Sequence, residues 1–173
     1  MHFLISGLPE SITVGGRDYP ICGDFRRWIL ITELLGEKRL PAMRKLELMA
    51  KLAGLAELPD DRTALAEALL RFASCGESVS GSGGSSGNTA PVFDFTADGD
   101  AIFSAFYQVY GIDLTQAPLH WWKFTALLKS LPPDTEFMSR IALRTMDLSR
   151  IEDDALRKKL RRARARVRLK DGE

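Results

Sequence analysis

Residues 93–132 read FDFTADGDAIFSAFYQVYGIDLTQAPLHWWKFTALLKSLP and set the fold class. Apolar residues recur every three to four positions up to Tyr110, and Gly111 follows, a pattern that predicts a helix and its end. From Asp113 or Thr115 to Leu131, apolar side chains occur on nearly every face, which predicts a second helix that is central to a core or an interface. This stretch therefore favours helix-on-helix packing.

The residues before this stretch predict a short hairpin and three helices. Residues 12–21 alternate apolar and polar side chains around Gly15-Gly16, a pair that tolerates the positive φ of a tight turn. The first helix follows Asp24, which can cap it, and buries Phe25, Trp28, Ile29 and Leu35. Two more helices begin at Pro41 and at Asp60 or Asp61.

The C-terminal part predicts a shorter helix from about Thr135 and a last helix from about Glu152 to Leu169. The fold class is therefore mainly α, a bundle of about six to seven helices with a short N-terminal β-hairpin. Residues 76–90 contain ten Gly or Ser in fifteen, which is typical of a flexible linker. We expect residues 1–75 to form the hairpin and helices, and residues 91–173 to form a helical region that packs with them.

Composition excludes several classes of protein. The chain has 173 residues, 45% hydrophobic and 27% charged, as in soluble globular proteins. No apolar run approaches the roughly 18 residues needed to cross a bilayer. Cys22 and Cys75 lack CxxC spacing, which favours two reduced, structural cysteines. Because phosphate-binding, zinc-protease and nucleophile-elbow motifs are absent, we predict a non-enzymatic protein with no catalytic residue, cofactor or metal site.

Two polar features have alternative interpretations. Asp94, Asp98 and Asp100 could supply oxygen ligands to a hard cation, but acids near a helix start more often cap free N–H groups, which we favour here. His120 is the only histidine away from the terminus. A lone general base would need a nucleophile that no motif provides, so a hydrogen-bonded structural histidine is the better interpretation.

Charge is distributed unevenly along the chain. Nine of the 24 Lys and Arg residues lie between Ala155 and Lys170, which leaves 15 against the 23 acidic residues elsewhere, a net charge of −8. The last helix carries one narrow apolar stripe, formed by Leu156, Leu160, Ala163 and Val167. Its cations can neutralise phosphates, contact an acidic protein surface, or remain solvated while the stripe docks. The residues alone indicate a binding module of unknown target.

Aromatic residues of the central helix also have two interpretations. Trp121, Trp122 and Phe124 can serve the folded core or anchor a protein partner. Neighbouring residues in a helix point about 100° apart, so both tryptophans cannot lie on one narrow seam. Core packing alone is the simpler interpretation, and the alternative places one tryptophan in the core and the other against a partner.

Three stretches together resemble the bacteriophage gene-product-fifteen family. They are LPESITVGGRDYPICGDFRRWILITELL from Leu8, the stretch quoted above from Phe93, and RTMDLSRIEDDALRKKLRRAR from Arg144. The combination of a hairpin followed by DFRRW, then YGIDL with HWWKF, then MDLSRI before a basic helix is specific. The resemblance covers most of the chain outside the linker.

This resemblance implies a tail assembly chaperone-like protein, encoded by a phage or prophage, that binds the tape measure protein during tail tube assembly. The implied partners are the tape measure protein and the major tail tube protein; self-association stays open, and no membrane is expected. We expect action in the cytoplasm of the bacterial host and absence from the mature virion. Partner contacts are assigned as a hypothesis to Trp121, Trp122, Phe124, Arg157, Arg161, Arg162, Arg164 and Arg168. The alternative is a nucleic-acid-binding accessory protein that uses the same basic helix.

Overall fold

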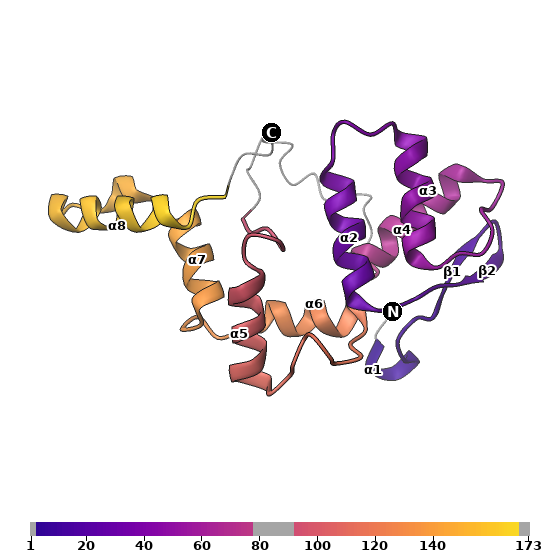
Figure 1. The fold of residues 1–173 in the computed structure, drawn as a ribbon, viewed down its shortest axis with the longest axis horizontal. Coiled ribbons are helices and arrows are strands. Elements are labelled where there is room, and N and C mark those ends of the chain that lie inside the picture. Colours follow the sequence, from indigo (N-terminus) through magenta and orange to yellow (C-terminus); the bar gives the residue numbers. More distant parts are fainter. Residues whose placement is uncertain (1–2, 78–91, 170–173) are drawn as a thin grey trace. The chain divides into compact units, whose positions relative to one another are not determined.

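The computed structural model describes residues 3–77 and 92–169. These residues are mainly helical, with one two-stranded antiparallel sheet, which confirms the predicted fold class (Figure 1). They divide into two units, each described here by itself. Unit 1 comprises residues 3–77 together with Pro118–Ala126, and unit 2 comprises residues 92–117 together with residues 127–169.

The predicted hairpin is present in unit 1. Strands β1 (Ser11–Val14) and β2 (Arg17–Pro20) pair antiparallel, with Val14 opposite Arg17. Gly15 and Gly16 have φ values of 58° and 81°, and a two-residue type I′ turn requires positive values at both positions. Ile12 and Val14 are buried, and β1 lies against helix α4 (Arg62–Ala73). The glycine pair therefore sets the register that turns the apolar side of β1 inward.

Three helices follow the hairpin where the sequence predicts them. Helix α2 (Phe25–Gly36) starts after Asp24, whose side chain accepts a hydrogen bond from a first-turn backbone N–H. Helix α3 (Ala42–Ala53) starts after Pro41 and ends at Gly54, and α4 is capped by Asp61. Helices α2 and α3 lie against each other, and α4 contacts both. The one-turn helix α1 (Phe3–Ser6) was not predicted and brings the described total to eight α-helices rather than six to seven.

Aromatic rings fill the core of unit 1. Trp28 and Phe72 have ring centroids 4.2 Å apart, and Phe25 stacks on Phe124 at 4.6 Å. The buried residues of α2 are Phe25, Trp28 and Ile31. Of the other predicted members of this face, Ile29 is half-buried and Leu35 is exposed in the last turn, whereas Ile31, three residues after Trp28, continues the buried face.

Residues 118–120 pair with the start of α2 before helix α6 (Trp121–Lys129) begins. The Phe25 N–H donates to the Leu119 carbonyl at 3.1 Å, and the Trp121 N–H donates to the Gly23 carbonyl at 2.8 Å. A helix starting at Asp113 or Thr115 was therefore a wrong prediction. The Asp113 carboxylate instead accepts from the backbone and hydroxyl of Thr115 in a turn, and Pro118 disfavours helical backbone at the residue before it.

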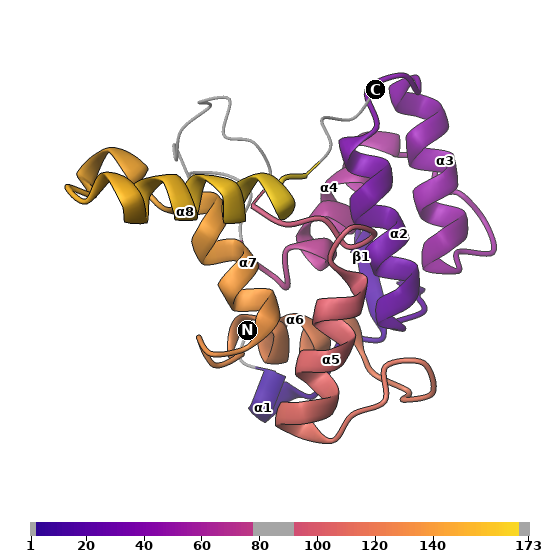
Figure 2. The same cartoon turned by 60° about the vertical axis from the view of Figure 1, so that its left-hand side comes forward.

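Unit 2 contains α5 (Gly99–Tyr110), α7 (Glu136–Thr145), a 3₁₀ turn η1 (Leu148–Arg150) and α8 (Asp154–Arg166). Helix α7 lies against α5, and α8 lies against α7. In Figures 1 and 2 alike, α8 runs across one end of α7. Helix α8 is shorter than the predicted span of residues 152–169: it starts after Asp153, which caps it and accepts from the backbone of Ala155 and Leu156, and it ends at Arg166.

The predicted domain scheme of residues 1–75, 76–90 and 91–173 stays a prediction. Residues 78–90 of the expected linker lie outside the described residues, and unit 1 includes Pro118–Ala126 as well as N-terminal residues. Among the described helices, none combines the length and the apolar character that a membrane span requires.

Candidate partner-binding surface

The basic C-terminal helix is observed as α8, and none of its residues is buried. At 100° per residue, the predicted stripe of Leu156, Leu160, Ala163 and Val167 shares one side of the helix. Three of these residues are half-buried, whereas Leu156 keeps 45% of its surface exposed. The described residues therefore cover the stripe only in part.

Two arginines beside this stripe bind the backbone of the segment that precedes α8. The Arg157 Nε donates to the Ile151 carbonyl at 2.9 Å, and its guanidinium pairs with Asp154 at 2.8 Å. The Arg164 Nη1 donates to the Met146 carbonyl at 3.4 Å. Both side chains hold α8 against the preceding segment of unit 2, so their first role is structural.

A second set of cations forms what we call the cation row: Lys158, Arg162 and Arg166, flanked by Lys159 and Arg161. The first three follow one another at intervals of four residues and so lie along one side of α8. All five are exposed, and none of their side chains makes a hydrogen bond or ion pair with any residue in 3–77 or 92–169. Of the predicted contact residues, Arg161 and Arg162 belong to this row, Arg157 and Arg164 are anchors, and Arg168 lies exposed beyond the helix.

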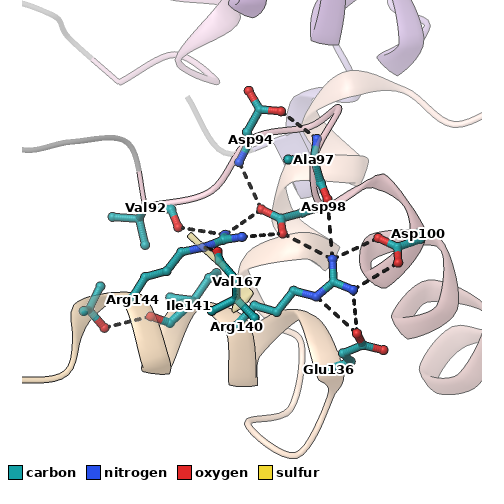
Figure 3. Close-up of polar contacts among 11 residues, drawn as sticks. Val92, Asp94, Ala97, Asp98, Asp100, Glu136, Arg140, Ile141, Arg144 and Val167 are labelled. Atoms are coloured by element: carbon teal, nitrogen blue, oxygen red, sulfur yellow. Dashed lines mark hydrogen bonds and ion pairs between the residues drawn. The ribbon is translucent and has the colours of Figure 1, made fainter. Parts of the chain in front are cut away.

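Unit 2 also contains a buried charge cluster that the sequence analysis did not assign (Figure 3). The Asp98 side chain, which is 0% exposed, accepts from Arg144 Nη1 at 2.6 Å and Nη2 at 2.8 Å. It also accepts from Arg140 at 3.4 Å and from the Asp94 N–H at 3.1 Å. One carboxylate therefore meets two guanidinium groups from consecutive turns of α7.

The two arginines of this cluster reach different neighbours. Arg144 donates to the carbonyls of Val92 and Val167, so it joins both ends of unit 2 to Asp98. Arg140 forms two hydrogen bonds with Asp100, at 2.9 and 3.0 Å, and pairs with Glu136 one turn before it on α7. Figure 3 shows both side chains extended from α7 toward the segment that begins α5.

This arrangement shifts the ionisation of its carboxyl groups. Burial by itself raises the pKa of Asp98, but the hydrogen bonds from Arg144, Asp94 and Arg140 outweigh it, so the pKa lies below its ordinary value of 3.8. The hydrogen bond from Arg140 also lowers the pKa of Asp100. The cluster is therefore ionised and internally paired at neutral pH.

The structure corrects the prediction that all three early aspartates cap. Asp94 does so, accepting from the Ala97 N–H at 2.7 Å, but Asp98 precedes α5 without any side-chain cap hydrogen bond. Its carboxylate pairs with arginines instead. Within the described residues, no group of three or more His, Cys, Asp or Glu side chains is arranged to hold a metal ion.

Trp121, Trp122 and Phe124 all lie in unit 1. Trp121 and Phe124 are buried, at 3% and 0% exposure, and their rings stack at 5.8 Å. The indole N–H groups of Trp121 and Trp122 donate to the carbonyls of Ala73 and Phe72 at the end of α4. This placement favours the core interpretation for Trp121 and Phe124, and only Trp122, which is half-buried, retains a surface for contact.

His120 is a hydrogen-bonded structural histidine. Its Nδ1 accepts from the Trp122 N–H at 3.1 Å, which leaves Nε2 to donate to the Pro9 carbonyl at 3.1 Å. Burial lowers the pKa of His120, in agreement with this neutral form. A Cβ added at Gly23 would lie 2.2 Å from the ring, so the imidazole fills a space that only glycine leaves open.

Comparison with known proteins gives a family. Residues 4–169 match the family described as bacteriophage Gp15 protein, which is nearly the whole chain. The chain belongs to the bacteriophage Gp15 family. No curated protein and no solved structure matches it. The resemblance found in the sequence is therefore confirmed, and the chain is a phage protein.

Two features of this Gp15-family chain were missing from the predicted site. The sequence analysis assigned no role to Arg140 and Arg144, although Glu136, Arg140 and Arg144 recur every four residues, a spacing that places them on one helix face. It also left Lys158, Lys159 and Arg166 out of the contact residues, because composition alone does not separate anchoring from unpaired cations. Helical spacing places the anchors on one side of the Leu156 stripe and Lys159 and Arg166 on the other, but does not show which side is anchored.

Proposed function

We propose that this Gp15-family chain is a non-enzymatic tail assembly chaperone, which binds the tape measure protein while the tail tube assembles. The observation that carries the proposal is the cation row, five exposed cations without a partner among the described residues. Charged groups that no intramolecular contact uses are available to bind a partner of opposite charge.

The physical demands of the task agree with this surface. A tape measure protein is a long, mostly helical chain, and its apolar seams would aggregate if they stayed exposed before the tube polymerises. The tube must later displace any helper, so several weak contacts serve better than one tight contact. An exposed helix with cations and a partly covered apolar stripe offers contacts of this kind.

The proposal is tested by co-expression with the tape measure protein of the same phage or prophage. We expect the chain to raise the soluble fraction of the tape measure protein severalfold and to co-purify with it at low ionic strength after nuclease treatment. The control partner is an unrelated helical protein of similar length and acidity. Failure to retain the tape measure protein, or equal retention of the control, would overturn the proposal.

A further inference from the structure

We propose that the cation row binds an acidic, amphipathic helix that lies along α8, rather than a nucleic acid or a second copy of this chain. This inference rests on the proposed function and names the partner chemistry of the same site. It is carried by the positions of the charges on α8, by the exposed Leu156 and by the acids at the start of the helix.

The cation row has the geometry of a helix-binding surface. Lys158, Arg162 and Arg166 are four residues apart, so successive charges are separated by about 6 Å along the axis. Acidic residues at intervals of three to four on a second helix recur at nearly the same distance. Two helices packed side by side can therefore match these charges one turn at a time.

The like charges of this row are unfavourable for α8 itself. Lys and Arg residues at i, i+4 destabilise a helix by a few tenths of a kcal/mol for each pair. Arg157 shows the alternative on the same helix, since it pairs with Asp154 three residues before it. Asp154 also lies four residues before Lys158 but pairs with Arg157, and no acid lies three or four residues from Arg162 or Arg166. Carboxylates from a partner would remove this repulsion.

Leu156 favours a protein partner over a nucleic acid. Its exposed side chain lies one turn from Lys159, so an apolar group borders the cations. An amphipathic helix at this edge of the row can cover Leu156 and Lys159 together, with leucine or valine next to its acids. A phosphate backbone offers no apolar complement. Residues 155–169 also contain no aromatic residue that could stack on bases.

Charge at the start of α8 points the same way. Glu152, Asp153 and Asp154 are exposed and precede the cation row directly. A duplex, which is negative along its whole length, would be repelled at this end. A partner helix can end before these acids, or it can carry basic residues opposite them. A second copy of α8 would bring two cation rows together, so self-association is unfavourable.

The test uses the full-length chain and a synthetic helical peptide of about 21 residues, with glutamates every four residues and leucines beside them. A peptide of the same composition with the glutamates spread around the helix is the control ligand, and a 21-base-pair duplex is the competing ligand. Fluorescence anisotropy at low and moderate salt measures each affinity. We expect the patterned peptide to bind at least tenfold tighter than either comparison ligand.

Charge-reversal variants assign the binding to the row. K158E/R162E/R166E should weaken peptide binding at least tenfold, because it replaces attraction by repulsion at three turns. K38E/R39E/K51E, which makes the same change in net charge at exposed cations of unit 1, should change it less than twofold. Circular dichroism checks that both variants keep their helix content.

The outcomes separate this inference from the proposed function. The inference would be overturned if the duplex bound more tightly than the patterned peptide, or if the two triple variants bound that peptide equally well. Dimerisation that K158E/R162E/R166E abolishes would overturn it too. Capture of the tape measure protein by K158E/R162E/R166E as well as by wild type would also overturn it, while the proposed function stands. Patterned-peptide binding without capture of the tape measure protein would support the inference and overturn the proposed function.

Discussion

Helices α7 and α8 lie against each other in unit 2, and both are rich in arginine, but their guanidinium groups have opposite environments. On α7, the side chains of Arg140 and Arg144 are only 17% and 11% exposed, and each has several acceptors. On α8, Arg161, Arg162 and Arg166 are exposed and unpaired within the described residues. Arginine therefore stabilises the fold in α7, whereas in α8 three arginines remain available to bind a partner.

The comparison shows that pairing, not charge count, separates structural from candidate functional cations. A buried cation must be hydrogen-bonded and neutralised, since desolvation otherwise costs several kcal/mol. An exposed cation has no such requirement, so its partner need not lie in the same chain.

Replacing Arg144 should have the largest effect. R144A would leave the buried Asp98 carboxylate with only Arg140 and the Asp94 N–H as partners and would remove the contacts to Val92 and Val167. We expect a loss of about 3–5 kcal/mol in the stability of unit 2. Hydrogen exchange of the α5 and α7 amides measures it. R150A, at an exposed ion pair in the same unit, is the control. A loss below about 1 kcal/mol would refute the structural role of Arg144.

Acid should weaken the same cluster. The folded pKa of Asp98 lies below its ordinary value of 3.8, so the unfolded chain binds the proton more readily. The stability that this group contributes is present above about pH 3.8 and is lost as the pH falls through the folded pKa. D98N should therefore be less stable than wild type at neutral pH and lose less on acidification. Urea denaturation between pH 6 and 2.5 measures how the free energy of unfolding of wild type and of D98N changes with pH. An identical pH dependence of the two proteins would contradict the prediction.

Replacing Arg140 should cost less than replacing Arg144. Two of its partners, Asp100 and Glu136, are mostly exposed and can be rehydrated when the guanidinium is removed. We expect R140A to destabilise unit 2 by about 1–2 kcal/mol, between the values typical of neutral hydrogen bonds and of hydrogen bonds to charged groups. The same hydrogen-exchange measurement applies. A larger loss than that of R144A would reverse the assigned order of the two arginines.

Much of the fold could be predicted because its signals are local. Gly15-Gly16, the caps Asp24, Asp61 and Thr135, and Gly111 each act within one turn of the residue that they terminate or start. The start of α6 could not be found in this way. Its position depends on residues 118–120 pairing with Gly23 and Phe25, far away in the sequence.

The candidate site was predictable as a segment but not residue by residue. Nine cations marked the last helix, yet the sequence does not show that Arg157 and Arg164 reach backbone carbonyls while Arg162 does not. The arginine partners of Asp98 are more than 40 residues away along the chain, and no local pattern joins them to it. Long-range pairing is decided by packing, which periodicity alone does not specify.

The anchors of α8 should have a small, local effect. R157A removes the hydrogen bond to Ile151 and the ion pair with Asp154, both at the edge of unit 2. We expect a loss of about 0.5–1.5 kcal/mol in the local stability of α8, seen as faster hydrogen exchange of its amides, with little change in α5. Equal acceleration in α5 would show that α8 does not open by itself.

Neutralising the cation row should have the smallest effect on stability. In K158Q/R162Q/R166Q, no intramolecular pair is lost within the described residues, and repulsion between successive turns is removed. We expect the stability of α8 to change by less than about 0.5 kcal/mol, as for ordinary surface positions, and toward greater stability. Hydrogen exchange of α8 measures the change against R157A. If the row stabilised the chain as Arg144 does, the loss would exceed that of R157A, and the distinction between paired and available arginines would fail. A neutral or slightly stabilising result instead leaves partner binding as the property that these cations serve.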